Sequence, residues 1–154
     1  MPTSYASSVL PATADEVWRY LRDFGNFAEW HPAIETCAIE SGDPAKPGCV
    51  RRLVGPDGSV FLERLAELDD EERVQAYDFV ESPFPVRDFH ATLRVAPVTE
   101  TEEAFVEWRA TFEAAPADAL KMQKIFSRGV FGVGLRELRK RYPGPGDPED
   151  RDAR

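Results

Sequence analysis

The segment that most constrains the fold is 117–142, which follows Pro116 and contains no internal proline. Its apolar residues recur at the spacing of an α-helix and fall on two sides. They are Met122, Phe126, Val130 and Val133 on one side, and Leu120, Phe131, Leu135 and Leu138 on the other. The pattern predicts one long helix with a narrow basic arc, so the rest of the chain must cover most of its circumference.

Three glycines, Gly129, Gly132 and Gly134, lie in the middle of this predicted helix. Each costs about 1 kcal/mol relative to alanine in a helix interior, so their presence needs a reason. Two interpretations are open. The glycines allow another element to pack closely against the helix backbone, or they leave space for a ligand beside Phe126 and Val130.

The preceding residues alternate between apolar and polar with a period of two, which is typical of strands. Strands are predicted at 3–10, 34–41, 48–54, 59–68, 73–81, 87–98 and 104–114. Two short helical turns follow the first strand, and Thr13 with Glu16 forms a capping box at the start of the first turn. Short connections make neighbouring strands antiparallel. We therefore predict an α+β domain over 1–142, with a curved seven-stranded antiparallel sheet around the long helix, and a flexible acidic Pro/Gly tail over 143–154.

The alternation also predicts which side chains face the helix. In 104–114 it places Trp108 inward with Val106, Ala110 and Phe112. The same phase turns three charged side chains inward, namely Arg51, Glu63 and Glu81. A buried carboxylate needs a cation, ordered water or a wet cavity, and Arg51 is a candidate cation for Glu63. Alternatively, the two glutamates lie at strand ends near solvent, or one strand is misassigned by a residue.

Composition excludes several function classes. The net charge of −9 argues against a nucleic-acid partner, because phosphate binding needs a basic surface. No apolar run reaches the roughly 18 residues of a membrane span, and the N-terminus lacks the order of a signal peptide, so we expect a cytoplasmic protein. Cys37 and Cys49 lack metal-binding spacing and are interpreted as small buried hydrophobes. We expect no metal and no cofactor.

Several segments resemble a known superfamily. The predicted order of elements is similar to the helix-grip fold of the START-like, or SRPBCC, superfamily. The segments 18–23, 30–34, 48–53 and 63–65 resemble its bacterial polyketide cyclase/dehydrase-like branch. The run 63–71, of the form ERL-x-x-LDDE, and the pair Phe126 and Val130 resemble the plant abscisic-acid receptors. The resemblance covers about residues 5–141.

The resemblance implies an internal cavity for a small hydrophobic or lipid-like molecule. Its lining would comprise Phe61, Tyr77, Phe79, Phe89, Ala91, Phe126, Val130 and Gly134, together with Trp108 and Arg51. Glu63 would reach a polar group of the ligand through water, and the loops 55–58 and 82–87 would stand at the mouth. Two positions depart from the receptors: Glu35 replaces a lysine that pairs with the hormone's carboxylate, and 83–85 replaces a His-Arg pair. With Glu35, Glu63 and Glu81 present, a neutral or cationic ligand fits better.

Three functions are considered. The first is binding of a small hydrophobic molecule, and the second is a cyclase or dehydratase that uses Glu63 with Tyr77 or Glu81 as acid and base. The third is a regulatory or interaction module without a ligand, and a homodimer is left open as a partner. His31 and His90 are interpreted as structural or surface residues.

Overall fold

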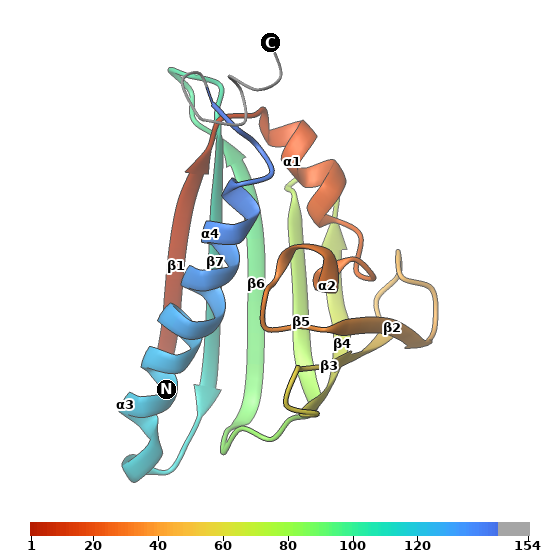
Figure 1. Cartoon of the computed structure of the whole chain (residues 1–154), viewed down its shortest axis with the longest axis vertical. Coiled ribbons are helices and arrows are strands. Elements are labelled where there is room, and N and C mark those ends of the chain that lie inside the picture. The colour runs from red at the N-terminus through yellow and green to blue at the C-terminus, as the bar shows by residue number, and fades with distance from the viewer. Residues whose placement is uncertain (145–154) are drawn as a thin grey trace.

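Seven antiparallel strands form one sheet in the computed structural model, which describes residues 1–144 (Figure 1). The strand order in the sheet is β1-β7-β6-β5-β4-β3-β2. The strands are β1 (Thr3–Leu10), β2 (Thr36–Ser41), β3 (Val50–Val54), β4 (Val60–Asp69), β5 (Val74–Glu81), β6 (Arg87–Pro97) and β7 (Ala104–Glu113). Each predicted strand agrees with its observed bounds to within two residues, because the alternation and the turn residues were unambiguous.

Two short helices, α1 (Ala14–Leu21) and α2 (Phe27–Trp30), follow β1. Thr13 caps α1, since its hydroxyl accepts a hydrogen bond from the Glu16 backbone N–H at 3.2 Å. The C-terminal helix runs along one face of the sheet and passes in front of β7 (Figure 1). This arrangement confirms the predicted helix-grip architecture. The expected flexible tail over 143–154 falls almost wholly outside the described residues.

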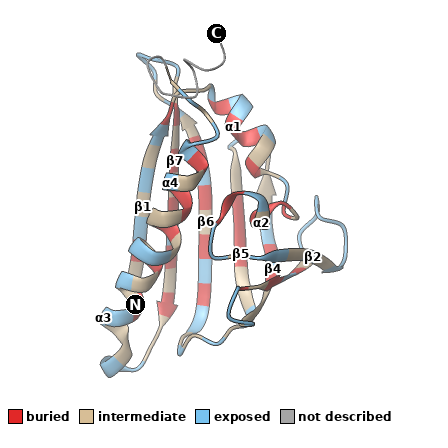
Figure 2. Ribbon diagram, viewed as in Figure 1, coloured by how far each residue is buried: buried red, intermediate tan, exposed pale blue. Residues whose placement is uncertain are grey.

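The inner face of the sheet carries the core, as the alternation predicted (Figure 2). Trp108 and Phe112 of β7 are fully buried, and Phe89, Ala91 and Leu93 of β6 are buried beside them. Cys49 is buried and Cys37 is half-buried. The core residues therefore come from the expected strand phases.

The C-terminal helix differs from its prediction in two respects. First, it is covered on one side only, and Leu120 is 63% exposed. Second, it is not α-helical throughout: α3 (Pro116–Lys124) and α4 (Val133–Arg139) flank a π-helical segment, η1 (Ile125–Gly132). The wider turns of η1 change which side chains share a face, so the two apolar sides predicted for an ideal α-helix do not hold here.

Candidate functional site

A cavity of about 90 Å³ lies between the sheet and the C-terminal helix. Its wall is mostly aromatic, and the polar side chains that face it are few. The lining residues are Phe27, His31, Ala33, Ile34, Leu53, Phe61, Glu63, Tyr77, Phe79, Phe84, Phe89, Phe126, Val130 and Phe131. A cavity needs about 10–15 Å³ to hold one water molecule, so this one has room for several waters or for a small ligand.

Packed rings fix the shape of the cavity. Phe79 of β5 and Phe89 of β6 stack with their centroids 3.8 Å apart and an interplanar angle of 8°. The ring centroid of Phe126 in η1 lies 4.8 Å from that of Phe89 and 5.1 Å from that of Phe112 in β7. Aromatic pairs at these distances add to the stabilisation from burial alone. The sheet and the helix therefore hold the apolar wall from two sides.

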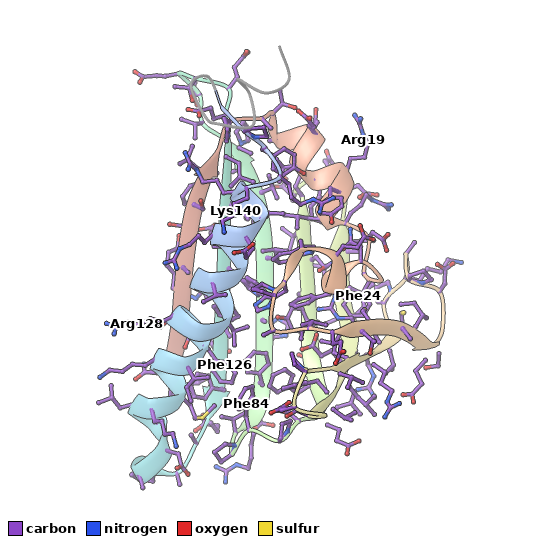
Figure 3. The ribbon with its side chains drawn as sticks, viewed as in Figure 1. Arg19, Phe24, Phe84, Phe126, Arg128 and Lys140 are labelled. Carbon is purple, nitrogen blue, oxygen red and sulfur yellow. The ribbon has the colours of Figure 1, made fainter. Side chains whose placement is uncertain are left out.

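Phe84 forms part of the cavity wall. It lies on the loop between β5 and β6. Its ring centroid is 5.5 Å from that of Phe61 and 5.2 Å from that of Phe126. In Figure 3 the labelled Phe84 and Phe126 lie together near the lower end of the helix. The loop between β3 and β4 lies at the same end of the sheet (Figure 1). Phe84 thus joins the loop between β5 and β6 to the aromatic wall of the cavity.

Glu63, which lines the cavity, forms a buried ion pair with Arg51, which lies behind the wall. They are directly opposite each other in the register of β3 and β4. Arg51 Nε and Nη2 both donate to Glu63 Oε1, at 2.9 and 2.7 Å, and Arg51 Nη1 donates to the carbonyl of Phe24 at 3.1 Å. Burial raises the pKa of Glu63, and the Arg51 guanidinium offsets part of that rise. The inward phase predicted for both residues is confirmed.

Aromatic rings surround the guanidinium of Arg51. Its Cζ lies 4.0 Å from the ring centroid of Phe24, 4.5 Å from that of Phe27 and 5.0 Å from that of Tyr77. Such contacts stabilise a desolvated cation. Arg51 itself does not line the cavity; it balances the charge of Glu63, which does.

Tyr77 presents its ring to the cavity, and its hydroxyl accepts a hydrogen bond from Trp108 Nε1 at 3.2 Å. Burial raises the pKa of Tyr77 well above its ordinary value, and the nearby charge of Glu63 adds to this. The phenol is therefore protonated throughout the physiological range. Trp108 lies behind Tyr77 and stacks on Phe131 at 4.5 Å.

His31 is buried at the cavity wall, and both of its ring nitrogens have partners. Nε2 lies 2.7 Å from the Val130 carbonyl oxygen, and Nδ1 accepts the Ala33 backbone N–H at 3.1 Å. Since Nδ1 accepts, the ring is the neutral tautomer with its hydrogen on Nε2. Burial lowers the pKa of His31 and the charge of Arg51 acts in the same direction, while the hydrogen bond to the Val130 carbonyl opposes this shift. His90, in contrast, is exposed on the outer face and pairs with Asp78 at 2.6 Å.

Seven of the residues predicted to line the cavity do so: Phe61, Glu63, Tyr77, Phe79, Phe89, Phe126 and Val130. Ala91 and Trp108 are buried but lie behind the wall. Glu35 and Glu81 are exposed, since Glu35 precedes the edge strand β2 and Glu81 ends β5. The strand-end alternative thus applies to Glu81 and not to Glu63, and Glu81 does not line the cavity with Glu63.

Gly134 lies outside the cavity lining, contrary to prediction. A Cβ at this position would stand 2.6 Å from His31 Cδ2 and 3.0 Å from Trp108 Cζ3, so only glycine allows the imidazole and indole to approach the helix this closely. A Cβ at Gly129, in contrast, would meet no atom within 4 Å. For Gly134 the close-packing interpretation therefore holds.

Seven lining residues were not predicted: Phe27, His31, Ala33, Ile34, Leu53, Phe84 and Phe131. Leu53 shares the inward phase of Arg51, so the strand pattern contained that signal. Phe131 was assigned to the other side of an ideal α-helix. Phe84 lies in a loop, where periodicity gives no orientation.

Two absences concern the described residues. No helix within 1–144 is long and apolar enough to span a bilayer. The same residues contain no group of three or more histidine, cysteine, aspartate or glutamate side chains placed to hold a metal ion.

Comparisons with known proteins agree with this geometry. A family model described as polyketide cyclase / dehydrase and lipid transport matches residues 1–142. The abscisic acid receptor PYL7 of Arabidopsis thaliana is 29% identical over 98 residues, which cover 62% of this chain and 46% of the receptor. The chain thus matches about half the length of that relative.

Two solved bacterial structures are similar over nearly their whole length. The protein XoxI of Bacillus cereus has a TM-score of 0.82 at 27% identity, covering 92% of this chain and 96% of its own. A Thermobifida fusca protein solved by NMR has a TM-score of 0.84 at 32% identity, covering 92% of this chain and 93% of its own.

Proposed function

The chain belongs to the polyketide cyclase/dehydrase and lipid transport family, and we propose that it binds a small apolar molecule that carries one hydroxyl or amino group. The observation that carries this proposal is the aromatic cavity with the carboxylate of Glu63 at its wall. Apolar walls with a few convergent polar groups are typical of small-molecule sites. The similarity to a receptor named for abscisic acid, a small molecule, supports binding as the activity.

The ion pair supports the proposed polarity of the ligand. Both hydrogen bonds that Arg51 donates to Glu63 go to Oε1, and Oε2 accepts no hydrogen bond from any described residue. A hydroxyl or ammonium group in the cavity would satisfy Oε2. A ligand carboxylate would instead place a second negative charge beside Glu63, and like charges at short distance in a low dielectric repel strongly.

A matched set of naphthalenes tests this proposal: 1-naphthol, 1-naphthylamine and 1-naphthoate, with affinities measured by calorimetry and by ¹⁵N chemical-shift changes. We expect the hydroxyl and amino compounds to bind at least about tenfold more tightly than the carboxylate, a difference of about 1.4 kcal/mol. Glu63→Gln should reduce this preference in the folded protein. Glu81→Gln removes an exposed carboxylate of the neighbouring strand and should leave the preference unchanged. Tighter binding of naphthoate, or no binding of any compound, would refute the proposal.

Catalysis is a second candidate, because Glu63 and Tyr77 both line the cavity. A carboxylate and a protonated phenol at one cavity wall could abstract and deliver a proton in the loss of water from a β-hydroxy ketone. Formation of the conjugated enone, followed by ultraviolet absorbance, tests this. Turnover that Glu63→Gln abolishes would support catalysis, and absence of turnover with a bound β-hydroxy ketone would leave binding as the activity.

A further inference from the structure

The π-helical segment η1 brings three side chains of the C-terminal helix to the cavity wall. Successive residues of an α-helix turn by about 100°, so Phe126 and Phe131 would point about 140° apart. In η1 both are buried, their ring centroids are 6.4 Å apart, and both line the cavity with Val130. The composition of this wall therefore depends on the π-helical register.

Hydrogen bonding in η1 is irregular next to Val130. The Val133 backbone N–H is shared between the carbonyls of Arg128 and Val130. The Val130 carbonyl has a second partner, His31 Nε2, at 2.7 Å. His31 belongs to the segment just after α2, so this bond joins two parts of the chain that are 99 residues apart.

His31 is held so that it can form this bond. Its Nδ1 accepts the Ala33 N–H at 3.1 Å, and its ring stacks on Phe27 with the centroids 5.2 Å apart. Gly134, one turn after Val130, has no side chain to displace the imidazole. The ring therefore has a fixed tautomer, a fixed plane and a clear approach to the helix.

We propose that His31 is a positioning residue: its Nε2–H holds the Val130 carbonyl and thereby keeps Val130 and Phe131 in the cavity wall. The effect on ligand affinity rests on the proposed function. The effect on the register of η1 does not, and it can be measured in the free protein.

Burial favours the neutral form of His31, whereas its bond to the Val130 carbonyl favours the protonated form. Protonation would add a hydrogen at Nδ1 and remove the acceptor of the Ala33 N–H. Arg51 on β3 opposes a second positive charge nearby. Glu137 on α4 favours that charge, but it is paired with Lys140 at 2.8 Å. Glu63 on β4 also bounds the cavity, but its charge is paired with Arg51.

The test measures the affinity for N-phenyl-1-naphthylamine, a neutral fluorescent probe with one N–H, in His31→Ala, His31→Gln and His90→Gln. The chain has two histidines, so His90 is the matched control. We expect His31→Ala to weaken binding at pH 7.5 about tenfold or more. His31→Gln, whose amide can replace the Nε2–H donor, should restore the affinity to within about threefold of the original. His90→Gln should change nothing.

If His31→Ala does not fold, a pair of glycine variants replaces it. Gly134→Ala places a Cβ against the imidazole, whereas Gly129→Ala adds one where no atom lies within 4 Å. Weaker probe binding and shifted amide resonances of residues 130–133 in Gly134→Ala alone would support the proposal. Equal probe affinities and equal amide shifts in Gly134→Ala and Gly129→Ala would overturn the proposal.

Rescue by His31→Gln separates positioning from a purely structural role, because only a side chain that donates to the Val130 carbonyl should restore the probe affinity. Unchanged affinity of folded His31→Ala, with only a lower melting temperature, would overturn the positioning role. If neither the original protein nor any variant binds the probe, the proposed function fails. The amide resonances of residues 130–133 in ligand-free His31→Ala still test whether His31 holds the π-helical register of η1.

Discussion

The buried pair of Arg51 and Glu63 gives the strongest stability prediction. Arg51 is 1% exposed and makes two hydrogen bonds to Glu63 Oε1 and one to the Phe24 carbonyl. Glu63→Gln keeps the shape of the side chain but removes its charge. The guanidinium of Arg51 then lies among three aromatic rings without a counter-charge. Breaking a buried pair from one side costs about 3–5 kcal/mol, and arginine cannot lose its proton to escape this cost. For a chain of this length that corresponds to a decrease in melting temperature of roughly 6–20 °C.

The reverse variant, Arg51→Met, should behave differently with pH. Its uncompensated carboxylate can take up a proton, and burial already raises the pKa of Glu63 in the intact pair. Between the unfolded pKa and the higher folded pKa, the folded state binds more protons than the unfolded state. The stability of Arg51→Met should therefore increase as the pH is lowered toward 5, because proton uptake favours the folded state.

Denaturant titrations of both single variants and of the double variant Arg51→Met/Glu63→Gln complete the cycle. The double variant should be more stable than the sum of the single losses predicts, by about 1–3 kcal/mol. A loss below about 1 kcal/mol for Glu63→Gln, or strict additivity in the cycle, would refute the reasoning.

Three further predictions concern the core, the mouth and pH. Trp108→Ala should cost about 3–5 kcal/mol in a denaturant titration, because Trp108 is fully buried between Tyr77 and Phe131; a loss below about 1 kcal/mol would contradict this. Phe84→Ala should accelerate association and dissociation of N-phenyl-1-naphthylamine in stopped-flow fluorescence, because the resemblance places the loop 82–87, which carries this ring, at the mouth; unchanged rates would place entry elsewhere. The free energy of unfolding should decrease as the pH falls below 6.5, because the folded pKa of His31 is lower than the unfolded value and the unfolded state then binds more protons; the same slope in His31→Gln would contradict this.

Sequence alone predicted the sheet, its strand phases and the inward direction of Glu63 and Arg51. These features follow from local rules, because the period of two sets the faces and the short turns set antiparallel neighbours. Both residues were predicted to point inward from neighbouring strands, and this was enough to suggest the ion pair. The N-cap at Thr13 was equally local.

Tertiary structure decided the rest. Glu81 has the same phase as Tyr77, yet the end of β5 leaves it in solvent, and periodicity carries no information about where a strand leaves the core. The π-helical register of η1 brings Phe131 to the cavity. His31 and Gly134 meet across 103 residues of chain only because α2 and the C-terminal helix pack together. Residue patterns determine faces within one element, whereas contacts between distant elements depend on how those elements finally pack.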